Sequence, residues 1–315
     1  MLGVAALGHE GRPRAVLIAG PTASGKSALA MAVAERIDGV IVNADSMQVY
    51  RELRILTARP TTADEARVPH RLYGHVGVRD AYTVARWLGD VAAVLDDLDR
   101  AGRPAVFVGG TGLYFTALTT GLSEVPAVPA EVRASVRAMA ATLGAAGLHA
   151  RLAEADPVMA ERLGPADGQR VARALEVLAA TGRSLSEFQG ERSAPLVPLD
   201  RAAAFVVAPD RAWLRARIET RFRMMVGEGG LDEARAFAAI GVDPSMPAAK
   251  AIGVPEMTAA ATGAMAVEDA IAAAVTATRQ YAKRQETWFR NQFGGWTRFA
   301  PYAGAVDEMV AAATR

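Results

Sequence analysis

The segment that most constrains this chain is Gly20-Pro21-Thr22-Ala23-Ser24-Gly25-Lys26-Ser27. It follows the apolar run Ala15–Ala19 and precedes an alanine-rich stretch of helical character that begins at Ala28. A glycine-rich loop between a strand and a helix directs backbone N–H groups at a polyphosphate, and the positive end of the helix adds to the attraction. In such a P-loop we expect Lys26 to contact phosphate oxygens and Ser27 to hold Mg²⁺. An ordinary glycine turn would not require this flanking strand and helix.

A phosphate-binding loop does not by itself identify the reaction. Kinases, ATPases, GTPases and transferases that release diphosphate all need the same anion site. The rest of the chain must therefore discriminate among these classes.

The composition of the chain indicates its cellular compartment and the type of metal that it can bind. The 315 residues are 51% hydrophobic and 22% charged, as in a soluble globular protein, and the net charge is only +1. The absence of cysteine excludes disulfides and zinc–thiolate sites, and the four histidines are scattered, so we expect any metal to be Mg²⁺ held by oxygen. No apolar run is long enough to span a membrane, and residues 1–14 lack the hydrophobic core of an export signal. A cytoplasmic protein is expected.

Four short apolar runs predict the strands of a parallel sheet. They are Ala15–Ala19, Val40–Asn43, Ala105–Val108 and Ala204–Ala208, and helix-length segments separate the first three. Such near-continuous apolar strands are typical of a sheet with helices on both faces. The sequence thus predicts an α/β fold with a P-loop NTPase-like core over residues 1–122 and 200–315. Residues 123–199 show helical spacing and predict a mostly helical insertion domain.

Two basic regions suggest contact with nucleic acid. In the insertion, helical spacing places Gln169, Arg170 and Arg173 on one face, while Val171, Leu175 and Leu178 turn inward. Near the C-terminus, the stretch 279–298 interleaves five cations, among them Arg284, with aromatic residues. A terminal helix with packed aromatics and solvated cations would explain that stretch equally well.

The loops that follow the predicted strands hold the residues best placed for chemistry, because a parallel sheet binds ligands at the carboxyl ends of its strands. Asp45 follows the second strand and is suited to act as a general base or as an outer-sphere partner of Mg²⁺. Thr111 follows Gly109-Gly110 after the third strand. The structural alternatives are that Asp45 caps a helix beginning near Met47 and that Thr111 caps a helix over 113–118.

Six separated motifs of the chain resemble the motifs of one protein family. They are Gly20–Ser27, Asn43–Arg51, Pro69-His70, Val108–Tyr114, Gln169-Arg170 with Arg173–Val177, and Ala251–Gly253. In order and spacing they are similar to those of the tRNA dimethylallyltransferases, also called tRNA isopentenyltransferases, over about residues 14 to 298.

The resemblance implies transfer of a dimethylallyl group from dimethylallyl diphosphate to the exocyclic amine of the adenine 3′ to the anticodon, with release of pyrophosphate. It implies that Lys26, the P-loop and Lys250 bind diphosphate, that Asp45 removes the amine proton, and that Thr111 contacts substrate near the reactive centre. The implied contacts to the tRNA anticodon stem-loop are Asp45, Ser46, Met47, Gln48, Thr111, Arg133, Gln169, Arg170, Val171, Ala172, Arg173, Lys250 and Arg284.

The chain departs from the family pattern at two positions. Lys250 stands where the family commonly has arginine, and Arg59 stands where lysine is usual.

A free-nucleotide isopentenyltransferase would share the chemistry but would not need the insertion. A small-molecule P-loop kinase would leave Asp45–Gln48 unexplained, and a non-catalytic RNA-binding module would have no use for the phosphate site. No surface pattern suggests an obligate partner, so a monomer is expected.

Overall fold

The computed structural model describes residues 15–190, 192–301 and 304–314. The chain divides into two compact units, one ending at Thr119 and resuming at Leu196, and the other spanning Thr120–Pro195. Residues 1–14, on which the expectation about export rests, lie outside the described residues.

The larger unit is built on one parallel sheet. Among the described residues its strands are β1 (Ala15–Ala19), β2 (Val40–Asn43), β3 (His70–Arg71), β4 (Ala105–Gly109), β5 (Ala202–Val207) and β6 (Thr297–Phe299), in the order β3-β2-β4-β1-β5-β6. The predicted α/β parallel sheet is confirmed. The edge strands β3 and β6 were not predicted, because two or three residues are too few to give a periodic signal.

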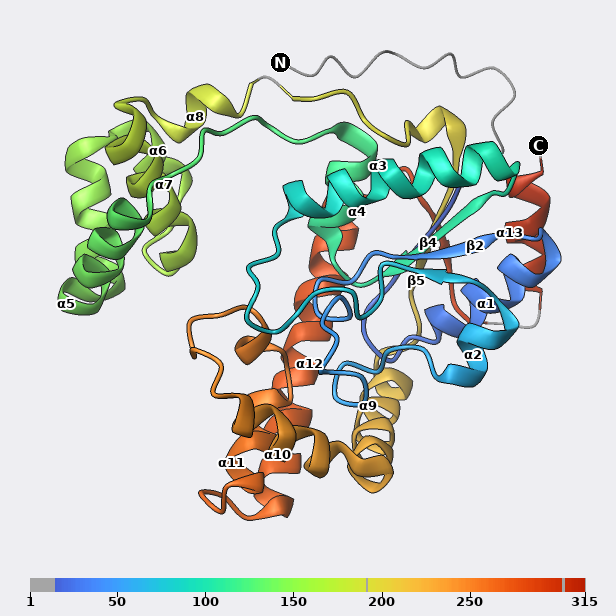
Figure 1. Cartoon of the computed structure of the whole chain (residues 1–315). Coiled ribbons are helices and arrows are strands. Elements are labelled where there is room, and N and C mark those ends of the chain that lie inside the picture. Colours follow the sequence, from blue (N-terminus) through green and yellow to red (C-terminus); the bar gives the residue numbers. More distant parts are fainter. Residues whose placement is uncertain (1–14, 191, 302–303, 315) are drawn as a thin grey trace. The chain divides into compact units, whose positions relative to one another are not determined.

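The larger unit also contains most of the helices (Figure 1). They are α1 (Lys26–Arg36), α2 (Thr62–Arg67), α3 (Val84–Ala101), α4 (Gly112–Thr120), α9 (Arg211–Met225), α10 (Leu231–Ile240), α11 (Val254–Ala261), α12 (Val267–Gln292) and α13 (Ala305–Ala313).

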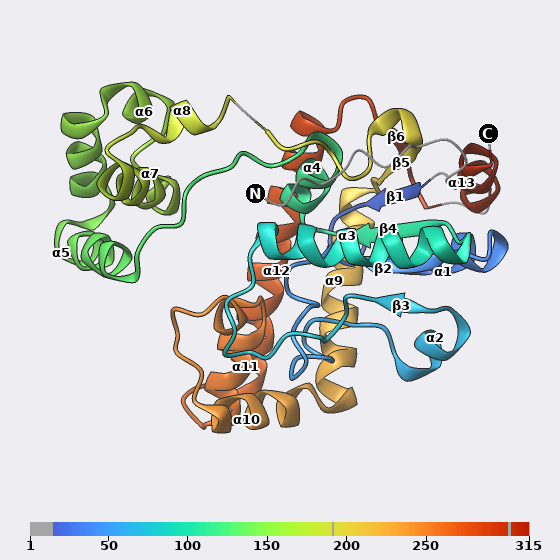
Figure 2. The same cartoon turned by 45° about the horizontal axis from the view of Figure 1, so that its top comes forward.

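Both faces of the sheet are covered, as the apolar strands require. Side chains alternate along β1, so that Leu17 packs into one core with α3, α4 and α12. Val16 and Ile18 pack into a second core with α1 and α13. The helices α9 to α12 gather beside the carboxyl ends of the strands (Figures 1 and 2), where α12 contacts both α9 and α11.

The strand order brings three loops together. The strands β2, β4 and β1 are neighbours, and the loops after them carry Asp45, Gly110 and the P-loop respectively. The chain leaves β1 toward β2 on one side and later adds β5 on its other side, so the carboxyl edge near β1 is a switch point of the kind that forms ligand crevices in α/β sheets.

The smaller unit is helical. It contains α5 (Ala130–Ala155), α6 (Pro157–Arg162), α7 (Gly168–Thr181) and α8 (Leu185–Phe188) around its own apolar core. Val171 and Leu175 of α7 are buried in that core, as predicted, whereas Leu178 is only half-buried. Val171 has no exposed surface, so its side chain belongs to this core, and its contact with tRNA stays a prediction.

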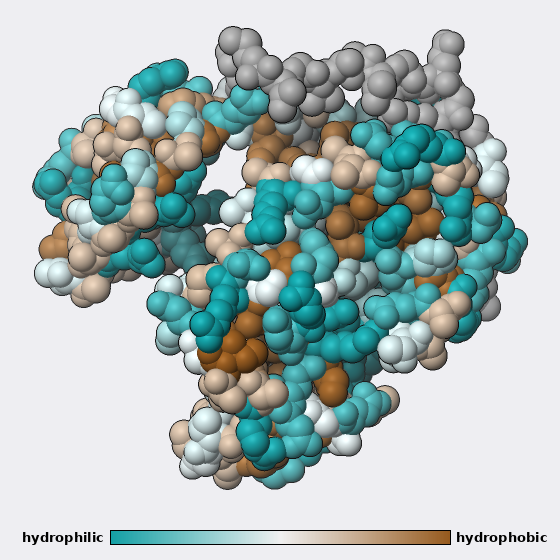
Figure 3. Space-filling model, viewed as in Figure 1, coloured by the Kyte–Doolittle hydropathy of each residue, from teal (hydrophilic) through white to brown (hydrophobic). Residues whose placement is uncertain are grey.

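The exposed surface is mainly hydrophilic on the face shown in Figure 3, with hydrophobic residues in separate patches. Within the described part of the chain, no helix has both the length and the apolar character needed to cross a bilayer.

Candidate active site

The P-loop adopts a tight turn that only certain residues tolerate. Gly25, directly before α1, has φ +88°, a conformation that glycine adopts without steric cost. At Gly20 a Cβ would lie 2.9 Å from Ser24 Oγ and 3.1 Å from Val207 Cβ, so the chain must pass there without a side chain. Ser27 lies exposed in the first turn of α1, where backbone N–H groups lack partners within the helix. The loop therefore has the form of an anion cradle.

Lys26 is held inside this cradle. Its Nζ donates a hydrogen bond to the carbonyl of Pro21 at 3.2 Å. Burial lowers the pKa of Lys26 to about 8, the Asp45 carboxylate opposes that decrease, and the Arg221 guanidinium adds to it. The three charged groups thus lie near enough to influence one another, and Lys26 still carries its charge at neutral pH.

Asp45 is positioned by a buried asparagine. Asn43, at the end of β2, has no exposed surface, and its amide accepts from the backbone N–H of Asp45 and donates to the carbonyls of Asp45 and Leu72, at 2.9 to 3.0 Å. The carboxylate Oδ1 accepts from the Met47 backbone N–H at 3.0 Å. No described helix starts between β2 and α2, so the alternative that Asp45 caps a helix is wrong. Asp45 forms a local turn and keeps its other oxygen, Oδ2, on the side of Gly110.

Thr111 ties the loops of β2 and β4 together. Its Oγ1 accepts from the Ser46 backbone N–H at 2.9 Å and lies 3.2 Å from the Ser46 hydroxyl. The helix α4 does follow Thr111, but the hydroxyl is occupied by the neighbouring loop and does not cap that helix. A Cβ on Gly109 would overlap the Ala44 carbonyl, 2.0 Å away, which shows how closely these loops approach.

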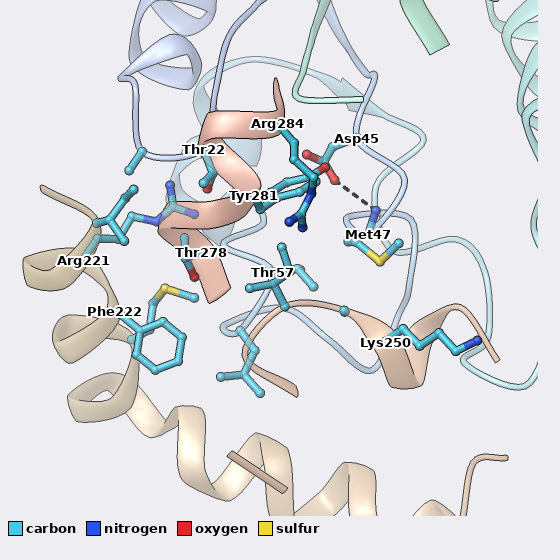
Figure 4. A pocket seen from close by; sticks show the side chains of 16 residues that line it. Thr22, Asp45, Met47, Thr57, Arg221, Phe222, Lys250, Thr278, Tyr281 and Arg284 are labelled. Atoms are coloured by element: carbon cyan, nitrogen blue, oxygen red, sulfur yellow. Dashed lines mark hydrogen bonds between the residues drawn. The ribbon is translucent and has the colours of Figure 1, made fainter. Parts of the chain in front are cut away.

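A cavity of about 240 Å³ opens between these loops and the helices α9 and α12. Figure 4 shows Thr22, Asp45, Arg221, Tyr281 and Arg284 around one part of it. Other parts of the wall are largely apolar: Ala23, Met47, Leu56, Ile218, Phe222, Met225, Ala251 and Ile252. The cavity thus combines a charged region beside the P-loop with an apolar region that suits a short hydrocarbon chain.

Two residues of this wall were not identified from the sequence. Arg221 has no ion-pair partner among the described residues, and burial lowers the pKa of its guanidinium. Tyr281 lies close to Asp45, and burial, with the Asp45 charge in second place, raises the pKa of its hydroxyl, which therefore stays protonated. A signal did exist, because Arg221 falls within the buried face of α9 that Ile218, Phe222 and Met225 form at helical spacing.

The two departures from the family pattern have different structural settings. Lys250 is exposed at the rim of the cavity, and Figure 4 shows its ammonium group directed away from Arg221 and Thr22. Arg59 donates to the carbonyls of Tyr50 and Arg51 and packs where a Cβ on Gly74 would otherwise lie, 2.1 Å from its Nη1. Arg59 therefore supports a loop of the fold, while Arg221 lies near enough to Lys26 for its charge to lower the pKa of that ammonium.

The other residues predicted to contact tRNA lie in three settings. Gln48 donates both amide hydrogens to the carbonyls of Thr57 and Ala58, which leaves its oxygen for other contacts. Arg284 lines the cavity. In the smaller unit, Arg133, Gln169 and Arg170 are exposed, Ala172 is half-buried, and Arg173 lies 3.6 Å from Glu176. These assignments stay predictions.

Family models match most of the chain. The IPP transferase model matches residues 48–292, and the isopentenyl transferase model matches residues 13–78. The chain is 51% identical over 288 residues to a tRNA dimethylallyltransferase of Agrobacterium fabrum, covering 91% of this chain and 97% of that one. It is 54% identical over 294 residues to one of Mesorhizobium japonicum, covering 93% and 91%.

Two solved structures superpose on most of this chain. The full-length tRNA isopentenylpyrophosphate transferase of Bacillus halodurans superposes with a TM-score of 0.67 at 31% identity, covering 95% of both chains. A eukaryotic dimethylallyltransferase, described as acting on tRNA, superposes with a TM-score of 0.76 at 25% identity, covering 91% of this chain and 74% of that chain.

Proposed function

The chain belongs to the IPP transferase family, and from that premise we propose that the cavity between the P-loop and Asp45 is its reaction chamber. The protein is an enzyme that transfers a dimethylallyl group to tRNA, at the exocyclic amine of the adenine 3′ to the anticodon. The observation that carries the assignment of the site is that P-loop residues, the Asp45 carboxylate, the Arg221 guanidinium and an apolar wall line one cavity. Lys26 lies near enough for the charges of Asp45 and Arg221 to shift its pKa.

The donor in this proposal is dimethylallyl diphosphate. Its diphosphate would lie on the backbone N–H groups that begin α1, with Lys26 and Arg221 on its oxygens. These cations oppose the charge that grows on the leaving group as the allylic C–O bond breaks, which stabilises the transition state. The apolar wall that includes Met47 and Phe222 would enclose the five-carbon chain and exclude water from the reacting carbon.

The acceptor amine would enter from the side of Asp45. As the new C–N bond forms, the amine must lose a proton, and the carboxylate of Asp45 is placed to accept it. The C–O bond electrons leave with pyrophosphate, so charge balances without a further reactant. Thr111 would hold the Asp45 loop in position through Ser46. The adenine must leave its stack to reach the cavity, which costs a few kcal/mol.

A divalent metal accompanies the diphosphate substrate in this family, and we assign Mg²⁺ to Ser27. The fit is reasonable, because an exposed hydroxyl in the first turn of α1 is the ligand that a P-loop offers, with substrate oxygens completing the shell. When bound, the ion would neutralise charge on pyrophosphate.

The helical unit Thr120–Pro195 would bind the anticodon stem-loop through Arg133 and through Gln169, Arg170 and Arg173 of α7. These residues would contact phosphates, which position an RNA without reading its sequence. We propose that the enzyme acts as a monomer in the cytoplasm.

The test is transfer by the purified protein with Mg²⁺, dimethylallyl diphosphate, and either unmodified tRNA or AMP, followed by mass analysis. A prenyl-sized mass gain on tRNA alone supports the proposal. A gain on AMP alone would favour a free-nucleotide isopentenyltransferase. No gain on either, with ATP consumed in the presence of a small acceptor, would favour a kinase.

A further inference from the structure

The helix α12 presents one buried polar side chain to both halves of the site. Gln285 is 5% exposed, although the helix around it packs through apolar residues such as Ala282 and Phe289. Burying an amide without hydrogen bonds costs free energy, so the amide of Gln285 requires hydrogen-bond partners within the protein. They lie on the P-loop and on the loop after β4.

The amide of Gln285 bridges these two loops. Its Oε1 accepts from the backbone N–H of Thr22 at 2.9 Å, and its Nε2 donates to the carbonyl of Gly110 at 2.8 Å. The orientation of the amide is dictated by its partners, because one offers only a donor and the other only an acceptor. A Cβ on Gly110 would lie 2.2 Å from Nε2, so the glycine is what admits the bridge.

The bridge connects the anion cradle to the base. Thr22 belongs to the loop that holds Lys26, and Gly110 precedes Thr111, whose hydroxyl holds the loop of Asp45. Tyr281 lies one turn earlier on α12, beside both Thr111 and Gln285. One face of α12 thus contacts the P-loop and the loop after β4, and through Thr111 it is linked to the loop of Asp45.

We propose that Gln285 is a positioning residue that sets the separation between the bound diphosphate and the Asp45 carboxylate. This inference rests on the proposed function of the cavity. Each loop is anchored independently, the P-loop on β1 and α1 and the other on β4 and α4, so loss of the bridge leaves both present. What changes is their spacing, and misplacement of reacting groups by about 1 Å can reduce a rate by about 100-fold.

The experiment compares Gln285→Met with wild type by single-turnover transfer to an anticodon stem-loop. Methionine keeps the length and burial of the side chain but neither hydrogen bond. Gln280→Met is the matched control, since Gln280 is exposed on the same helix. We expect the rate of transfer at saturating substrates to fall about 10- to 100-fold in Gln285→Met alone, while the Kd values for inorganic pyrophosphate and for the stem-loop change less than about threefold.

Gln285→Asn provides a second, polar variant in case methionine unfolds the protein. It shortens the side chain by one C–C bond, about 1.5 Å, so the amide cannot reach both loops. A folded variant with a transfer rate within twofold of wild type would overturn the inference, as would weakened binding with an unchanged rate at saturation. Absence of transfer by wild type would instead overturn the proposed function.

Discussion

Lys26 should give the enzyme a pH dependence that can be calculated from its environment. Burial disfavours the charged form of the ammonium and lowers its pKa to about 8 in the free protein. Only the charged form attracts diphosphate, so kcat/KM for dimethylallyl diphosphate should follow the protonated fraction of the free enzyme. That fraction is about nine-tenths at pH 7, one-half at pH 8 and one-tenth at pH 9.

The predicted result is a decline in kcat/KM of about tenfold between pH 7 and pH 9, through one ionisation. Lys26→Arg is the control, because a guanidinium keeps its charge over this range. The variant should be less active but should show no decline centred near pH 8. Steady-state rates at limiting diphosphate and saturating tRNA measure both profiles. A flat wild-type profile, or the same decline in Lys26→Arg, would refute the assignment of this titration to Lys26.

Three further predictions follow from named contacts. Arg221→Ala should raise KM for the diphosphate about 10- to 100-fold, because it removes a charged hydrogen-bonding partner of the substrate. The control is Arg217→Ala, since Arg217 is exposed one turn away on the same helix, and its KM should not rise. Equal effects of the two variants in steady-state kinetics would contradict the placement of Arg221. Charge reversal at Arg170 and Arg173 should weaken tRNA binding and reduce the slope of log K against log salt by about 2, and an unchanged slope in filter binding would argue against phosphate contacts. Gly74→Ala should cost about 2–4 kcal/mol of unfolding free energy, because φ is positive there and the displaced Arg59 guanidinium would lose its hydrogen bonds to Tyr50 and Arg51. Gly263→Ala, which has positive φ and open space, should cost about 1 kcal/mol. Equal losses in thermal denaturation would refute the role of Arg59.

The sheet and the loops that carry chemistry were predictable, because apolar strands and glycine-rich turns leave strong local patterns. The P-loop, Asp45 and Thr111 each lie in the loop after a predicted strand, and a parallel sheet places such loops along one edge.

What could not be predicted depends on packing between distant segments. Nothing near Lys250 in the sequence says that its side chain extends away from the cavity, or that Arg221 from α9 comes to lie near Lys26. The bridge by Gln285 joins residues separated by 263 and 175 positions. An arginine or glutamine on the apolar face of a helix is the signal to seek in such cases, since burial of a polar group requires a partner or a ligand.

The central claim is that Asp45 removes the proton of an amine held beside a diphosphate on the P-loop. The most direct test is rapid-quench single turnover with Asp45→Asn, accompanied by the Kd values for pyrophosphate and for the anticodon stem-loop. Asparagine keeps the size of the side chain and can still accept from Met47, but it is not a base at neutral pH. The account predicts a loss of transfer rate of at least about 100-fold with both Kd values within about threefold of wild type. A transfer rate within tenfold of wild type would contradict it.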